Sequence, residues 1–94
     1  MSLDIHKLQN GQPAELLISI SSTEYEELYP AIERFKSKTG LLIDQYSDLK
    51  LSSGVLPLIQ SIEEVSTESV FYNSLLKVLK QSEADGYGIM FVGD

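Results

Sequence analysis

Apolar and polar residues along this 94-residue chain follow either strand or helix periodicity, apart from one run near the end that is almost wholly apolar. That run, Tyr87–Val92, has no charged residue and no alternation, and it is bounded by Gly86 and Gly93. The pattern is typical of a strand covered on both faces, although a buried helix segment shares it. Its length and its glycines favour the strand. We therefore expect the last element to be a central strand on which the rest of the chain packs.

The first twenty residues predict a hairpin. Leu3–Leu8 alternates weakly, with Leu3 and Ile5 on one face, and Asn10-Gly11 then favours a two-residue turn because both residues tolerate positive φ. Glu15–Ser21 predicts the second strand, on which Leu16, Ile18 and Ile20 should share a face. Pro13 has no N–H and should limit the pairing.

A helix is predicted to begin at Ser22–Glu26, where Thr23 and Glu26 match a capping box. Gly40 is expected to end it. Pro30 conflicts with the helix because it removes the bond to the Glu26 carbonyl, so we expect either one kinked helix or two helices that meet there. The apolar stripe comprises Tyr25, Leu28, Ile32 and Phe35.

The second half predicts a short strand at Leu41–Ile43, a loop, and two more helices. Pro57 fits only the first turn of the earlier helix. Ser66–Glu68 predicts the cap of the later helix, whose wide apolar face is Phe71–Leu79 and which should end at Asp85-Gly86. The stripe of the earlier helix comprises Val55, Ile59 and Ile62.

The order (β)β-α-β-α-α-β predicts an α/β or α+β fold, with a small three- to four-stranded mixed sheet and about three helices packed on it. Residues 1–94 should form a single compact domain. The strand at Leu16–Ile20, the helix and the strand at Leu41–Ile43 predict a right-handed parallel crossover. Three helices are few for two-sided cover, so one sheet face should be partly open.

The net charge is −7, from 14 acidic and 7 basic residues. Such a charge repels nucleic-acid phosphates and anionic membrane surfaces, so we expect neither as a partner. No apolar run approaches the ~20 residues that span a bilayer, and Met1–Lys7 does not resemble a secretory signal. The absence of cysteine excludes disulfides and cysteine-based zinc sites and fits a cytoplasmic protein.

Asp44, Tyr46 and Asp48 alternate along the predicted loop. If the strands before Asp44 and Asp94 run parallel, both acids emerge at one sheet edge and could hold a divalent cation or a basic segment. The spacing departs from a calcium loop, because Leu49 stands where glycine belongs. The alternative interpretation is ordinary turn chemistry of a solvated loop.

Two further faces are candidates for contact with other molecules. Glu24 and Glu27 on the first helix could dock a basic protein, with Tyr25 or Tyr29 as anchor; the alternative is a solvated face with dipole-complementing acids. The Phe71–Leu79 helix could form a homodimer contact, although such a wide apolar face usually means burial.

No catalytic constellation is visible. His6 is the only histidine, and Gly86-Tyr87-Gly88 opens a strand rather than the helix that a dinucleotide motif requires. We therefore expect no enzyme and no cofactor. In size, acidity and lack of cysteine the chain resembles the small immunity proteins that neutralise bacterial toxins, a resemblance that implies an inhibitory protein-binding role.

The sequence thus predicts a non-catalytic protein-interaction module that binds a basic partner. One alternative is a small-molecule or divalent-metal-binding domain that uses Asp44, Asp48 and Asp94, and another is a homo-oligomer joined through the Phe71–Leu79 helix. The predicted partner-binding residues are Glu24, Glu27, Asp44, Tyr46, Asp48 and Asp94.

Overall fold

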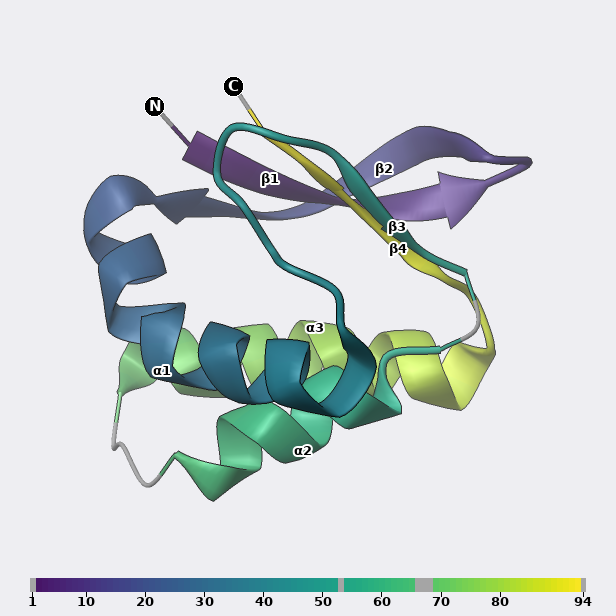
Figure 1. Cartoon of the computed structure of the whole chain (residues 1–94). Helices are drawn as coiled ribbons and strands as arrows, with labels where there is room; N and C mark the ends of the chain where they lie inside the picture. Colours follow the sequence, from purple (N-terminus) through teal and green to yellow (C-terminus); the bar gives the residue numbers. More distant parts are fainter. Residues whose placement is uncertain (1, 53, 66–68, 94) are drawn as a thin grey trace.

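The computed structural model describes residues 2–52, 54–65 and 69–93, and in that part of the chain it contains four strands and three helices. Figure 1 shows the three helices gathered on one side of the sheet. The predicted element order and the mixed α+β class are confirmed. The elements are β1 (Ser2–Gln9), β2 (Gln12–Ser21), α1 (Ser22–Thr39), β3 (Leu49–Leu51), α2 (Leu56–Glu64), α3 (Val70–Asp85) and β4 (Ile89–Val92).

The four strands form an entirely antiparallel sheet in the order β2-β1-β4-β3. Ile89 in β4 pairs with Lys7 of β1 on one side and with Leu51 of β3 on the other. The prediction that the final apolar run forms a central strand is therefore confirmed. Ile89 and Phe91 are only 0% and 1% exposed.

The uniform apolar character of β4 has a structural reason. Ile89 and Phe91 face the helices, so Met90 must face the other side of the sheet because side chains alternate along a strand. Met90 is also buried, and its cross-strand neighbours there are His6 and Lys50. Because both faces of β4 are buried, its sequence does not alternate between apolar and polar residues.

The predicted parallel crossover is wrong. Residues 41–48 contribute no strand to the sheet, and the third strand is Leu49–Leu51, which runs antiparallel to β4. Only Ile43 of the predicted Leu41–Ile43 strand is buried, whereas Leu41 and Leu42 are exposed. The segment Leu41–Ile43 is thus part of a loop, which the buried Ile43 side chain attaches to the core.

The hairpin prediction is confirmed, with φ values of 55° at Asn10 and 77° at Gly11. The predicted common face of Leu16, Ile18 and Ile20 is wrong at Leu16. Ile18 lies opposite Ile5, but Leu16 lies opposite His6, which makes Leu17 an extra residue in β2. As a result Leu16 is 50% exposed on the face without helices, while Leu17 packs toward the core.

The N-cap of helix α1 lies two residues earlier than predicted. The capping box is formed by Ser21 and Glu24, not by Thr23 and Glu26. The predicted apolar stripe is buried as expected, and Gly40 ends the helix with φ 79°. Of the two arrangements considered at Pro30, the structure has one continuous helix with Pro30 inside it.

Helices α2 and α3 lie on the same side of the sheet as α1. Pro57 lies in the first turn of α2, as predicted, and Gly86 ends α3 with φ 75°. The cap predicted at Ser66–Glu68 lies outside the described residues, and the residue that caps α3 is Ser69, whose hydroxyl accepts from the Tyr72 N–H at 3.4 Å.

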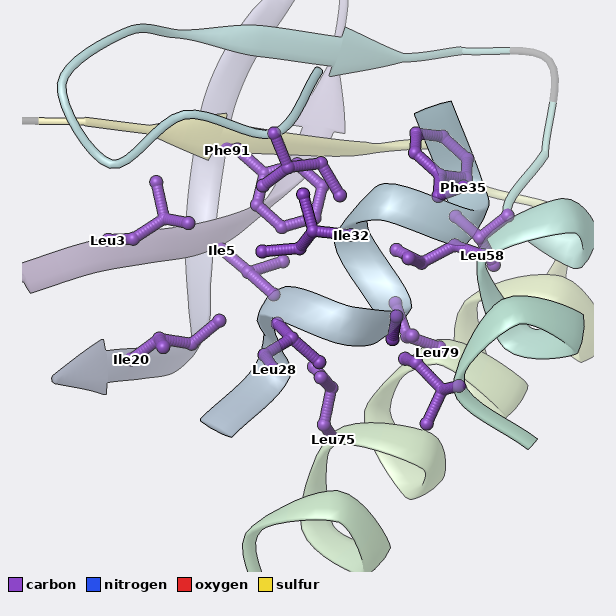
Figure 2. Packing of buried hydrophobic residues seen from close by; sticks show 14 of the residues in the cluster. Leu3, Ile5, Ile20, Leu28, Ile32, Phe35, Leu58, Leu75, Leu79 and Phe91 are labelled. Carbon is purple, nitrogen blue, oxygen red and sulfur yellow. The ribbon is translucent and has the colours of Figure 1, made fainter. Parts of the chain in front are cut away.

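One core lies between the sheet and the helices. Figure 2 shows strand residues such as Ile5 and Phe91 meeting Ile32 of α1 at its centre. Leu58 of α2 and Leu79 of α3 close the core from the helical side. Because this packing joins all the helices to β1 and β4, it fixes where the α1–β3 loop begins and ends.

Candidate functional site

The loop between α1 and β3, residues 40–48, is attached to the first turns of α1. The buried Tyr25 side chain donates a hydrogen bond from its hydroxyl to the carbonyl oxygen of Ile43, with an oxygen–oxygen distance of 2.7 Å. The Ile43 side chain is fully buried in the core. Figure 1 shows the loop, in teal, rising from the helical layer to the sheet before it enters β3.

A second tyrosine extends this contact to the surface. The Tyr29 ring lies one helical turn after Tyr25 and meets it edge to face, with ring centroids 6.1 Å apart and planes inclined by 60°. Tyr29 is 42% exposed and Tyr46, in the loop, is 56% exposed. Two large aromatic side chains are therefore presented to solvent around one buried tyrosine.

The tip of the loop is a turn organised by Asp44. One carboxylate oxygen of Asp44 accepts from the Tyr46 N–H at 3.1 Å, and the other accepts from the Ser47 hydroxyl at 3.4 Å. This is the turn chemistry that the sequence offered as the alternative to a cation site. The turn presents Tyr46 outward with an acidic residue on either side of it in sequence.

Asp48 joins the loop to the end of β4. Its carboxylate accepts from the Gly93 N–H at 3.1 Å. A β-carbon at Gly93 would lie 2.4 Å from the Ser47 nitrogen and 2.7 Å from the Tyr46 carbonyl carbon, so only glycine allows this approach. Asp94, predicted to share the site with Asp44, lies outside the described residues.

The pKa of Tyr25 reflects its burial and its acidic and aromatic neighbours. Burial, and then the nearby charge of Asp44 with smaller contributions from Tyr29 and Tyr46, raise the pKa of the Tyr25 hydroxyl above its usual value. We define the tyrosine–acid surface as Tyr29, Asp44, Tyr46 and, at the end of the same loop, Asp48.

No basic side chain forms an ion pair with the tyrosine–acid surface within the described residues. The ion pairs found there all end on α2: Arg34 and Lys38 contact Glu64, and Lys80 contacts Glu63. The hydrogen bond from Lys38, with the nearby positive charge of Arg34, lowers the pKa of Glu64. Three of the seven basic side chains thus pair with acids between α2 and its neighbouring helices.

The structure does not bring Glu24 and Glu27 into this surface. The Glu24 carboxylate accepts from the Ser21 N–H at 2.9 Å as part of the helix cap. The carbonyl oxygen of Glu27 accepts from the Tyr72 hydroxyl of α3 at 2.5 Å, and the Glu27 charge is the second cause, after burial, of a raised Tyr72 pKa. Glu27 therefore lies toward α3. Tyr29 instead has Glu26 and Glu33 as its helical neighbours at three and four residues.

Among residues 2–52, 54–65 and 69–93, no group of three or more acidic or histidine side chains is arranged to hold a metal ion. No helix in the same part of the chain is long and apolar enough to cross a membrane. His6 lies on the open face of the sheet, where its Nδ1 is 3.1 Å from the Ala14 carbonyl oxygen.

The apolar face of α3 is covered by the chain itself. Phe71, Tyr72, Leu75 and Leu79 are buried, and Leu76 packs against the core. A homodimer through this helix would therefore use its outer side, where Val70 is 84% exposed.

No family model, curated protein sequence or solved structure matches this chain. Its function must therefore be inferred from the residues of this chain alone.

The association of Tyr29 with Tyr46 was not predicted from the sequence. The paired exposure of Tyr29 and Tyr46 depends on the contact between Tyr25 and Ile43, which are 18 residues apart, and periodicity carries no information about such a contact. A partial signal was available, because a tyrosine within an apolar stripe needs a hydrogen-bond partner once it is buried.

Proposed function

We propose that this protein is a non-catalytic interaction module that binds a basic partner protein through the tyrosine–acid surface. The observation that supports this most is the exposure of Tyr29 and Tyr46 around the buried Tyr25, beside two carboxylates that have no basic partner among the described residues. Exposed tyrosines are frequent anchors of protein interfaces, since they bury a large area and offer a polar hydroxyl.

The acidic residues would serve recognition more than affinity. Attraction between a chain of net charge −7 and a basic surface accelerates encounter and disfavours acidic competitors. Asp44 and Asp48 are anchored by hydrogen bonds to Tyr46, Ser47 and Gly93, so their charges are presented by an ordered loop. An ordered surface loses less conformational entropy on binding than a flexible one.

The most specific form of the proposal is an inhibitory protein that neutralises a basic toxin or enzyme by covering its basic site. The acidity and small size of the chain support this form, because such an inhibitor competes with an anionic substrate for the same positive surface. We place this activity in the cytoplasm, where a cysteine-free chain has no redox-sensitive thiol.

Both sheet edges carry features that disfavour use as a docking strand. Edge strand β2 contains Pro13 and two register shifts, and edge strand β3 has only three residues. Prolines, bulges and short edge strands are the means by which proteins prevent strand addition. We therefore place the partner-binding surface on the loop and α1 and not on a sheet edge.

The test begins with affinity capture by the tagged wild-type chain, followed by identification and purification of the captured protein. Binding of the purified partner is then compared for wild type and for the double variant Tyr29→Ala/Tyr46→Ala. Loss of two interface anchors, each contributing about 2 kcal/mol, should weaken the dissociation constant by at least about 100-fold. Added salt should slow association.

A matched control removes exposed apolar side chains elsewhere. The variant Leu16→Ala/Val70→Ala changes residues on the open sheet face and at the start of α3, neither of which belongs to the tyrosine–acid surface. It should bind the partner like wild type. The proposal is wrong if the tyrosine variant binds with wild-type affinity, or if the captured partner presents no basic surface.

A further inference from the structure

A groove separates edge strand β2 from α3 on the helical side of the sheet. It has a volume of about 280 Å³ and is lined by Glu15, Leu17, Lys77, Val78, Gln81 and Tyr87. Binding pockets for drug-sized ligands run from roughly 300 to 1,000 Å³, so this groove suits a smaller molecule.

The apolar wall of the groove results from the irregular register of β2. Because Leu17 is the extra residue between Leu16 and Ile18, it faces the helical side, where Val78 and Tyr87 stand beside it. The ammonium group of Lys7 lies 4.6 Å from the centre of the Tyr87 ring and holds that ring by a cation–π contact. One member of the apolar wall, the Tyr87 ring, is therefore held in place by a residue of the sheet.

Two opposite charges stand on the facing walls of the groove. Glu15 belongs to β2 and Lys77 to α3. Neither forms an ion pair within the part of the chain that the structure describes, although both line the same hollow. Glu15 and Tyr87 line the same groove, and the charge of Glu15 contributes, after burial and Asp85, to a raised Tyr87 pKa.

We propose that this groove binds a small zwitterionic molecule with an apolar body, of which a free apolar amino acid is the simplest example. The ammonium group of the ligand pairs with Glu15, its carboxylate pairs with Lys77, and its apolar part lies on Leu17, Val78 and Tyr87. Charge complementarity on both walls specifies this class, since a molecule with one charge leaves one wall unpaired. This site is separate from the tyrosine–acid surface and does not depend on the proposed function.

An extended peptide is a poorer occupant of the same groove. A peptide strand would need continuous pairing with β2, which Pro13 and the register shifts next to His6 interrupt. A free small molecule requires no such pairing.

The test is an amide chemical-shift titration by two-dimensional NMR. L-Leucine and 6-aminohexanoate, which differ in charge spacing, are compared with isopentylamine and 4-methylpentanoate, each of which carries one of the two charges. At least one zwitterion should shift the amide signals of Leu17, Val78 and Tyr87, and the singly charged analogues should bind at least about tenfold more weakly.

Charge-removing variants identify the groove as the site. Glu15→Gln and Lys77→Met should each weaken zwitterion binding about tenfold, whereas Lys50→Met, on the face without helices, should leave it unchanged. Amide spectra of the free variants confirm that each is folded. No shift at about 50 mM of either zwitterion, or equal binding of the singly charged analogues, would overturn the proposal.

Discussion

The hydroxyl of Tyr25 and the carbonyl oxygen of Ile43 are 2.7 Å apart, and this hydrogen bond ties the α1–β3 loop to the helix that precedes it. The bond is buried, and the Tyr25 ring that makes it contacts the ring of the exposed Tyr29. The Tyr25–Ile43 hydrogen bond thus fixes the position of the loop and, with it, the position of Tyr46 relative to α1.

Removing this hydrogen bond should destabilise the protein and loosen the loop. Tyr25→Phe retains the ring but leaves the Ile43 carbonyl without its partner, which should lower the free energy of unfolding by about 1–2 kcal/mol. Urea denaturation measures the loss. Tyr29→Phe is the matched control, because Tyr29 contributes only a ring contact there, and its free energy of unfolding should change by less than about 0.5 kcal/mol. Equal stability of wild type and Tyr25→Phe would contradict this role.

Gly93→Ala should disturb the loop from its other end. The added methyl group would overlap backbone atoms of Tyr46 and Ser47, which cannot rotate away as a side chain could. We expect a loss of about 1–3 kcal/mol of stability and amide shifts across residues 44–48. Asp48→Asn, which retains an oxygen acceptor for the Gly93 N–H, should have a smaller effect. An unchanged loop spectrum in Gly93→Ala would show that the close approach is not present in solution.

Stability should fall at alkaline pH. The pKa values of Tyr25 and Tyr72 are raised in the folded state, mainly by burial. Each hydroxyl therefore favours folding fully below its ordinary pKa of 10.0, and that contribution is lost as the pH rises through the higher folded value. Tyr25→Phe should show a shallower fall in stability above pH 10 than wild type. A wild-type stability that stays constant from neutral pH to about pH 11 would contradict this.

Calcium or magnesium should leave the melting temperature unchanged. Both oxygens of the Asp44 carboxylate accept hydrogen bonds within the loop, and one oxygen of Asp48 accepts from Gly93. A ligand that binds only the folded state raises its stability, so a thermal shift reports binding directly. A rise of several degrees at about 5 mM metal that is lost in Asp44→Asn would instead support the cation-binding alternative.

The elements that could be predicted from the sequence are those whose signals are local. The turn at Asn10-Gly11 can be recognised because both residues tolerate positive φ. The buried stripe from Tyr25 to Phe35 can be recognised from its helical spacing. The helix start was misplaced because Ser21–Glu24 and Thr23–Glu26 both satisfy the capping pattern. The choice between them depends on Ile20, whose burial in β2 leaves Ser21 as the last extended residue.

The errors concern interactions between distant residues. Leu16 was placed on the same face as Ile18 and Ile20 because the register shift at Leu17 depends on pairing with β1, which alternation within β2 does not reveal. Leu41–Ile43 has the composition of a strand, but the edge of β4 is taken by Leu49–Leu51 instead. Asp44, Tyr46 and Asp48 were recognised as candidates, whereas the association of Asp44 and Tyr46 with Tyr29 around Tyr25 required the fold.

The most direct test of the interaction surface is a hydrogen-exchange footprint of the protein in complex with the partner obtained by affinity capture. Binding of the partner should slow amide hydrogen exchange in residues 26–33 of α1 and in residues 41–48 of the loop, because Tyr29 and Tyr46 lie there. Protection confined to β2, the outer side of α3 or the open sheet face, with exchange in residues 41–48 unchanged, would contradict it.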